Sequence, residues 1–215
     1  MKRAFTLAEV LITLGVIGVI AAITIPSVIK HYQKQAWTTQ LKKSYTILNQ
    51  AILMYMADQG ITTLESLNSD LRDLNVLKKY IKSTDIRKME NYKYTYLNSN
   101  VEQSDLDGRD ALIMADGTIL FKTTSNTYII DINGNKGPNK YGRDIFQFVF
   151  LSSKLYPKGS YELSKLLYEL SDKSGVNPNS RNWSSGTSLY NCRTDKESKG
   201  AGCSARIIEK GKMDY

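Results

Sequence analysis

The stretch FTLAEVLITLGVIGVIAAITIPSVI, residues 5–29, decides the fold of this chain. Residues 10–29 carry no charged side chain. Because an α-helix rises about 1.5 Å per residue, they would form a helix about 30 Å long, which matches the hydrocarbon core of a bilayer. A short basic leader, residues 1–4, precedes the stretch, and one carboxylate, Glu9, lies near its start. The stretch therefore predicts a membrane-spanning helix with a single acidic group at its leading end.

The order of these features differs from that of an ordinary secretory signal. Such a signal has a shorter apolar region, and its cleavage site follows that region. Here the only site suited to trimming lies before the apolar stretch, next to the basic leader. Lys2 and Arg3 favour a cytoplasmic N-terminus by the positive-inside rule. The charge bias is small, because basic residues also follow the stretch, at positions 30, 31 and 34.

These residues resemble the N-terminus of type IV pilins and of the pseudopilins of type II secretion. In those families a prepilin peptidase removes a short basic leader, cuts just before a Phe and methylates the new amine. The resemblance implies a cut between Ala4 and Phe5 and N-methylation of Phe5, although Ala4 stands where the families usually have Gly. It also places the assembly carboxylate at Glu9 and the helix-kinking proline at Pro26. The resemblance is specific over the first 57 residues and weaker beyond them.

The resemblance also implies a function. It predicts a structural subunit that assembles into a helical filament, either a type IV pilus or a type II secretion pseudopilus. The expected partners are further copies of the chain or other pilin subunits, the prepilin peptidase and an assembly-platform membrane protein. The expected location is a single pass through the bacterial inner membrane, with the N-terminus in the cytoplasm and the globular domain in the periplasm or outside the cell.

Glu9 has two interpretations. A charged group near the centre of a spanning helix costs about 2.5–3.5 kcal/mol on insertion scales, and less near an end, so Glu9 can simply rest among the lipid headgroups. The functional interpretation is that Glu9 pairs with the free amine of Phe5 on a neighbouring subunit, because opposite charges attract strongly in a low dielectric. Glu9 would then set the register of the filament. Pro26 likewise either kinks the helix or marks the membrane boundary.

The helix is expected to continue beyond the apolar stretch. Apolar residues recur there in helical steps, at Trp37, Leu41, Tyr45, Leu48, Ile52, Tyr55 and Met56. This stripe predicts an amphipathic continuation that lies against a globular domain, with Gly60 as a stop signal. The predicted organisation is a leader at 1–4, a transmembrane and assembly helix at 5–29, an amphipathic continuation at 30–60 and a globular domain at 61–215.

The globular part predicts an α+β fold. A second amphipathic helix is expected over residues 63–81 and a short one over 164–170, whereas 171–188 is typical of a surface loop. Strand-like runs are found at 92–97, 111–115, 118–122, 127–132 and 145–151. Asp116-Gly117 between two of these runs is a strong hairpin signal. A small antiparallel sheet packed on the long helix is the natural architecture, and it is the pilin fold that the resemblance implies.

Residues 131–144 are a candidate calcium loop. Oxygen-bearing side chains recur in this Gly-rich segment, at Asp131, Asn133, Asn135 and Asp144. Such oxygens in a tight turn are what Ca²⁺ needs, although the spacing departs from that of an EF-hand. The segment resembles the calcium loop of major pseudopilins, where a later Asp-Ile closes the site. The alternative is an Asx-rich turn without metal, favoured by the three basic residues in the same segment.

Cys192 and Cys203 are the only cysteines. Outside the cytoplasm a disulfide between them is expected, which would contribute about 2–4 kcal/mol, and many type IV pilins close a C-terminal loop in this way. In the cytosol two free thiols would be favoured. A zinc site is not expected, because the sole histidine, His31, lies far away in the sequence and beside the membrane.

The chain has a formal net charge of +8. Basic residues alternate with tyrosines between positions 78 and 96, a composition seen on nucleic-acid surfaces but more often on a solvated face. Acidic and basic patches could also meet between stacked subunits. No catalytic constellation or phosphate-binding loop is present in the sequence, so an enzyme is not expected. The alternatives to a filament subunit are a DNA-uptake minor pilin and an unprocessed membrane-anchored binding domain that never polymerises.

Overall fold

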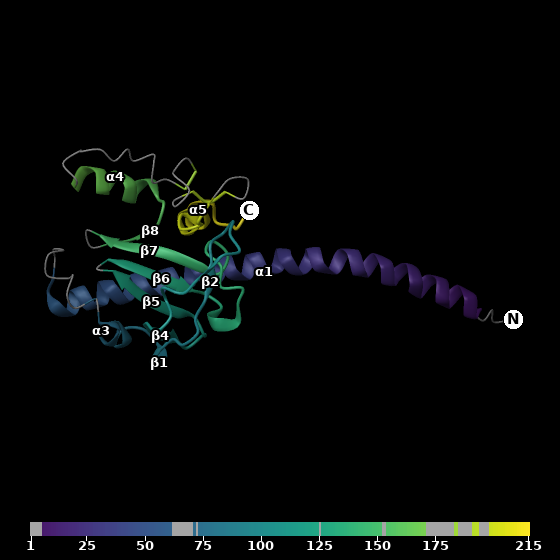
Figure 1. The fold of residues 1–215 in the computed structure, drawn as a ribbon, viewed down its shortest axis with the longest axis horizontal. Coiled ribbons are helices and arrows are strands. Elements are labelled where there is room, and N and C mark those ends of the chain that lie inside the picture. Colours follow the sequence, from purple (N-terminus) through teal and green to yellow (C-terminus); the bar gives the residue numbers. More distant parts are fainter. Residues whose placement is uncertain are drawn as a thin grey trace. The chain divides into compact units, whose positions relative to one another are not determined.

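The computed structural model describes residues 6–61, 71, 73–124, 126–151, 154–170, 183–184, 191–193 and 198–215. The chain divides into two compact units, residues 1–36 and residues 37–215, which we describe separately. One helix, α1 (Leu7–Gln59), contributes to both units (Figure 1).

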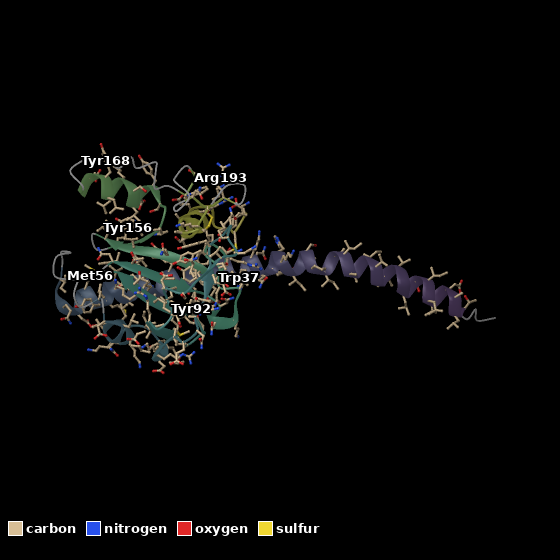
Figure 2. All side chains as sticks on the ribbon, viewed as in Figure 1. Trp37, Met56, Tyr92, Tyr156, Tyr168 and Arg193 are labelled. Carbon is tan, nitrogen blue, oxygen red and sulfur yellow. A yellow bond between two sulfur atoms is a disulfide. The ribbon has the colours of Figure 1, made fainter. Side chains whose placement is uncertain are left out.

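The first unit is the apolar part of α1. Its large apolar side chains are exposed, with 78% of Leu7 and 72% of Ile23 accessible, and Figure 2 shows them projecting from the helix. The helix runs through Pro26 without a break in its assignment. Among the residues that the structure describes, α1 is the one helix that is long and apolar enough to cross a membrane.

The second half of α1 belongs to the globular unit. One face of it is buried, with residues such as Leu41, Leu48 and Ile52 fully inaccessible. The helix ends at Gln59, and Gly60 follows with φ of 62°, a left-handed conformation that glycine adopts without a steric penalty. The amphipathic stripe and the stop signal at Gly60 are therefore both present in the structure.

A six-stranded antiparallel sheet forms the centre of the globular unit, in the order β1-β4-β5-β6-β7-β8. Its strands are β1 (Ser83–Lys88), β4 (Asp110–Met114), β5 (Ile119–Thr124), β6 (Thr127–Asp131), β7 (Ile145–Leu151) and β8 (Lys154–Pro157). A separate two-stranded hairpin consists of β2 (Tyr94–Thr95) and β3 (Glu102–Gln103). Besides α1, the helices within the described residues are α3 (Leu74–Lys78), α4 (Tyr161–Leu170), α5 (Cys203–Lys210) and the short 3-10 helix η1 (Gly134–Lys136). The expectation of an α+β fold with a long helix on a small antiparallel sheet is confirmed.

Both faces of the sheet carry a core, because side chains alternate between the faces along each strand. Leu120 and Ile130 face the α1 side, where Tyr45 of α1 stacks on Phe148 at 5.3 Å between ring centroids. Phe121 lies in a second cluster, against Tyr92 and the segment around β2. The sheet is therefore sandwiched between α1 on one side and irregular chain on the other.

Several elements differ from the sequence-based expectation. The run 92–97 is a strand only at β2, and Tyr92 before it packs its ring into the second core. The edge strands β1 and β8 and helix α5 were not expected, and α4 begins three residues before the predicted 164. Of the helix expected over 63–81, α3 is the helical part within the described residues, and 62–70 and 72 lie outside them. The predicted loop 171–188 also lies outside them, apart from residues 183 and 184.

The β4–β5 turn is tied to α1 by the carboxylate of Asp116. Lys43 and Gln40 of α1 each donate to Oδ2 of Asp116 at 2.8 Å, and the Thr118 amide donates to Oδ1 at 3.1 Å. Partial burial acts to raise the pKa of this carboxyl, but these hydrogen bonds outweigh it and lower the pKa to about 2. The carboxylate thus joins the hairpin turn to the helix in its charged form.

Replacing Asp116 by Asn should destabilise the fold by about 1–3 kcal/mol at neutral pH, because charge-assisted hydrogen bonds are lost. The folded-state pKa lies below the unfolded one, so the stabilisation is fully present above the unfolded pKa and is lost as the pH falls toward 2. Thermal unfolding of the full-length chain in detergent, followed by circular dichroism from pH 7 to pH 2, measures this. The exposed Asp110→Asn serves as the matched control. An equal loss at pH 7 and pH 2 would contradict the role of the charge.

Candidate functional site

The N-terminal end of α1 is closed by a reciprocal pair of contacts between Thr6 and Glu9. The amide and the hydroxyl of Thr6 both donate to Oε2 of Glu9 at 2.8 Å, and the Glu9 amide donates to the Thr6 hydroxyl at 3.3 Å. This is a capping box, in which two residues three apart satisfy each other's free amide groups at a helix start. Ala4 and Phe5, the predicted cleavage and methylation residues, lie outside the described residues.

The capping box gives Glu9 a structural role that the sequence analysis did not assign. The signal was present, because Thr followed three residues later by Glu at the start of an apolar run is the signature of such a box. Glu9 and Pro26, the two predicted assembly residues, are both exposed on α1. Within the described residues, they lie on a part of the helix that the rest of the chain leaves uncovered.

The loop 131–144 connects β6 to β7 and brings the predicted calcium ligands close together. Asp131 ends β6, and Asp144 directly precedes Ile145, its partner across the β6–β7 ladder. Both carboxylates are fully buried, with 0% of either residue accessible. Two adjacent buried carboxylates are costly unless protons, hydrogen bonds or a cation compensate their charge.

Asp131 receives its main contact from a distant residue. Tyr92 donates its hydroxyl hydrogen to Oδ2 of Asp131 at 2.7 Å, and the amide of Asn133 donates to Oδ1 at 3.2 Å. Burial nevertheless raises the pKa of Asp131 to about 8, and the charge of Asp144 adds to the rise. No sequence signal pointed to Tyr92, because it lies 39 residues earlier in the chain.

Asp144 is held by the backbone of the loop itself. The amide of Asn139 donates to Oδ2 at 2.9 Å, and the amide of Lys140 donates to Oδ1 at 2.5 Å. Burial raises the pKa of Asp144, and these two amides act in the opposite direction by favouring the charged form. The closing half of the loop is thus wrapped around the Asp144 carboxylate.

Two amide oxygens of the loop complete a candidate donor set. Within the described residues, Oδ1 of Asn133 and Oδ1 of Asn139 are buried and have no hydrogen-bond partner. Asn139 is only 8% accessible, and its amide nitrogen donates to Lys93 and, at 3.3 Å, to the exposed Asn135. A buried oxygen without a partner is unfavourable and is compensated when it binds a cation.

These residues fit a hard divalent cation such as Ca²⁺. Two buried carboxylates and two unpartnered amide oxygens are the kind of oxygen ligands that Ca²⁺ prefers, and backbone carbonyls and water would supply the rest. The described part of the chain holds no group of three or more His, Cys, Asp or Glu side chains suited to a metal, so the site depends on its amides. The sequence analysis named Asn133, and Asn139 is an addition from the structure.

The basic residues of the loop lie to the outside of this donor set. Lys136 and Arg143 are exposed, and the Arg143 guanidinium lies over the ring of Trp37 on α1 at 5.3 Å. Lys140 is half-buried and contacts Asp144 through its backbone amide. The Arg143–Trp37 contact links the loop to the first turn of α1 that belongs to the globular unit.

The two cysteines are joined in a disulfide between Cys192 and Cys203, and both are fully buried. The S–S distance is 1.96 Å. Cys203 is the first residue of α5, and the preceding segment lies beside residues 97 and 98, whose amides donate to the carbonyls of residues 199 and 198.

Two of the four tyrosines in the predicted basic and aromatic surface are buried, whereas Tyr80 and Tyr96 are half-buried. Tyr92 and Tyr94 are buried, and their hydroxyls donate to Asp131 and Asp105. Base stacking needs an exposed ring, so these two tyrosines cannot bind single-stranded nucleic acid in this conformation. The lysines and arginine at 78, 79, 82, 87 and 88 are exposed, as on a solvated face.

A model of the Family of unknown function (DUF6613) matches residues 27–212, which is most of the chain, and the protein therefore belongs to this family. The matched range includes the loop 131–144 and both cysteines, and it begins within the apolar part of α1. No curated protein and no solved structure matches the chain.

If the loop binds calcium, adding Ca²⁺ should stabilise the full-length chain in detergent. Binding to the folded state alone contributes about 2.7 kcal/mol at a hundredfold excess over Kd, which corresponds to a rise in Tm of about 5–10 °C. Asp131→Asn combined with Asp144→Asn should abolish this response, because the amides keep the size of the side chains but remove both charges.

Differential scanning calorimetry with Ca²⁺ and with a chelator measures the effect. Asp110→Asn, outside the loop, should respond as the wild type does. An unchanged Tm of the wild type after chelation would remove the calcium site.

Proposed function

We propose that this chain is a pilin-like structural subunit that crosses one membrane by the apolar part of α1 and polymerises into a helical filament. The filament is a type IV pilus or a type II secretion pseudopilus. A prepilin peptidase removes residues 1–4, and an assembly-platform membrane protein adds the processed subunit to the growing filament. Before assembly the subunit resides in the bacterial inner membrane, with its N-terminus in the cytoplasm and its globular unit in the periplasm or outside the cell.

One observation carries the proposal: the apolar part of α1 is exposed on all sides in the structure, with one acidic residue at its start. Exposed apolar surface costs roughly 25 cal/mol per Å², so this helix needs an apolar environment that the chain does not supply. Lipid provides that environment for a single subunit, and a bundle of equivalent helices provides it for a filament. The exposed apolar surface of α1 therefore suits both a single subunit in the membrane and a subunit packed in a filament.

The capping box adds a physical reason for Glu9 to act in assembly. Both hydrogen bonds that Thr6 donates are accepted by Oε2 of Glu9, so the box holds the carboxylate beside the backbone of the first helical turn. The amine that cleavage would create on Phe5 lies one residue before Thr6. A neighbouring helix staggered along the bundle can present this amine to Glu9, and in an apolar surrounding the pair neutralises two costly charges.

The globular unit supports an extracytoplasmic location. A buried disulfide is typical of an oxidising compartment, and a calcium loop suits a compartment where free calcium is abundant. A membrane-anchored domain that does not polymerise remains as an outcome of the processing experiment below. A DNA-uptake subunit loses support from the burial of Tyr92 and Tyr94.

The first expected outcome concerns processing. The mature chain isolated from its native membrane should begin at Phe5 with an N-methyl group, because the basic leader directly precedes Phe-Thr-Leu-Ala-Glu. Intact-mass and N-terminal peptide mass spectrometry measure this. Ala4→Gly should be processed at least as completely. A chain that retains Met1 would instead support a membrane-anchored domain that does not polymerise.

The second expected outcome concerns Glu9 and separates its charge from its capping role. Glu9→Gln keeps a residue that can complete a capping box but removes the charge, whereas Thr6→Ala removes the cap and keeps the charge. We expect Glu9→Gln and Glu9→Ala to be inserted and cleaved normally but to assemble poorly, because the partner amine is left buried without a counter-charge. Thr6→Ala should assemble.

Filament yield divided by the amount of processed subunit in the membrane is the measured quantity. Glu9→Asp, which keeps the charge on a shorter side chain, should give an intermediate yield. Normal filaments from Glu9→Gln together with failure of Thr6→Ala would show that capping, and not charge, is what assembly requires.

A further inference from the structure

We propose that residues 198–203, which we call the disulfide segment, position the closing half of the loop 131–144, so that the Cys192–Cys203 bond must form before the loop binds a divalent cation tightly. This inference rests on the candidate cation site described above. It adds an order of events, oxidation first and cation second, and it names residues outside the donor set as positioning residues.

The first contact is between the loop and the disulfide itself. Gly142 has φ of 75°, and a Cβ atom built on it would lie 2.6 Å from Sγ and 3.2 Å from Cβ of Cys203. The loop backbone at Gly142 therefore packs directly on the sulfur atom, with no room for a side chain. Asp144, whose carboxylate belongs to the donor set, is only two residues further along.

The second contact is made by the segment before Cys203. A Cβ atom on Gly200 would lie 2.9 Å from the carbonyl oxygen of Tyr141, so the two backbones are in close approach. The amide of Tyr141 in turn donates to Thr95, and the Thr95 amide donates to Asn139, each at 2.9 Å. Residues 139–142 are thus enclosed between β2 and the segment that the disulfide closes.

The third contact comes from the C-terminal residue. The hydroxyl of Tyr215 donates to the carbonyl of Gly142 at 2.5 Å. Arg206 of α5 holds this end in place, because its guanidinium lies over the Tyr215 ring at 4.9 Å and donates to the carbonyl of Cys192. An ion pair between Arg206 and Asp214 at 2.8 Å completes the arrangement. One basic side chain therefore connects the disulfide to the residue that contacts the loop.

These three contacts support the part of the loop that carries two of the proposed cation ligands, Asp144 and Asn139. The Asp144 carboxylate is held by the amides of Asn139 and Lys140, and Asn139 carries one of the unpartnered oxygens. All of these residues lie within three positions of Gly142. If the disulfide segment is released, this half of the loop loses its support on one side, and the ligands must be ordered at the moment of binding. Preorganised ligands bind more tightly because that ordering has already occurred.

Tight binding of a cation by the loop 131–144 therefore depends on prior formation of the disulfide. Its formation removes two electrons and two protons from the two thiols and transfers them to an oxidised dithiol partner by thiol–disulfide exchange. A chain that has not met an oxidising compartment keeps the thiols and a loosely held loop. The loop then becomes a tight cation site only after oxidation.

Isothermal titration of the full-length chain in detergent with CaCl₂ tests this. Supporting residues around a metal typically change its affinity by about 10–100-fold, and we expect a loss in that range when the disulfide is reduced or replaced in Cys192→Ala combined with Cys203→Ala. Circular dichroism monitors whether these forms stay folded. Tyr215→Phe keeps the disulfide and the aromatic ring but removes the hydroxyl that donates to Gly142, and it should weaken calcium binding several-fold. Tyr161→Phe, on the exposed start of α4, is the matched control and should bind as the wild type does.

The outcomes distinguish the role of the disulfide from the existence of the cation site on which that role rests. Equal affinity of the oxidised wild type, the reduced chain and Tyr215→Phe would overturn the inference while leaving the cation site intact. Absence of calcium binding by the oxidised wild type would overturn both. If reduction unfolds the chain, Tyr215→Phe alone decides, because a wild-type affinity in that variant contradicts positioning by the C-terminal residue.

Discussion

The packing of the second half of α1 on the sheet is the interaction on which the rest of the structure depends. Leu41, Leu48 and Ile52 are fully buried there, and Tyr45 stacks on Phe148 of the sheet. Removing such side chains from water is the main favourable term in folding. Asp116 adds a polar tie between the same helix and the β4–β5 turn. The sheet is thereby fixed on the second half of α1, whereas the exposed apolar half of the same helix is available to contact lipid or other molecules.

The opposite face of the sheet supports the candidate cation site. The second core places Tyr92 beneath the loop 131–144, where its hydroxyl reaches Asp131. The β2 segment contacts Asn139 from one side, and the disulfide segment contacts Gly142 from another. Three separate parts of the chain thus converge on one loop. This convergence explains how two buried carboxylates can be held close together in spite of their mutual repulsion.

The features that the sequence predicted are those with a local physical signal. The helical stripe from Trp37, the Asp116-Gly117 turn and the apolar run of β7 each depend on neighbouring residues, and each is present in the structure. The four predicted calcium residues also lie in one loop, although Asn135 is exposed at its edge. Local signals were sufficient for these elements because burial patterns and turn residues act over a few positions.

Other features had no such signal or had one that was not used. The edge strand β1 is polar and does not alternate regularly, so its pairing with β4 depends on the completed sheet. Tyr92 reaches Asp131 across 39 positions, which no local pattern reveals. The cap formed by Thr6 is different, because its signature stands in the sequence beside Glu9. Glu9 therefore caps the helix start in addition to carrying the charge that suggested an assembly role.

The two edges of the sheet have a consequence for the proposed filament, in which copies of the chain would be concentrated side by side. An open edge strand offers unpaired backbone groups to another chain and is a common start of β-aggregation. Here one edge, β1, carries the exposed charges of Asp85, Arg87 and Lys88, and the other edge, β8, ends in Pro157, which lacks an amide hydrogen. Strand-to-strand growth is disfavoured at both edges. In the proposed filament, ordered association between copies would therefore be directed to the helix, even at the very high local concentration of a polymer.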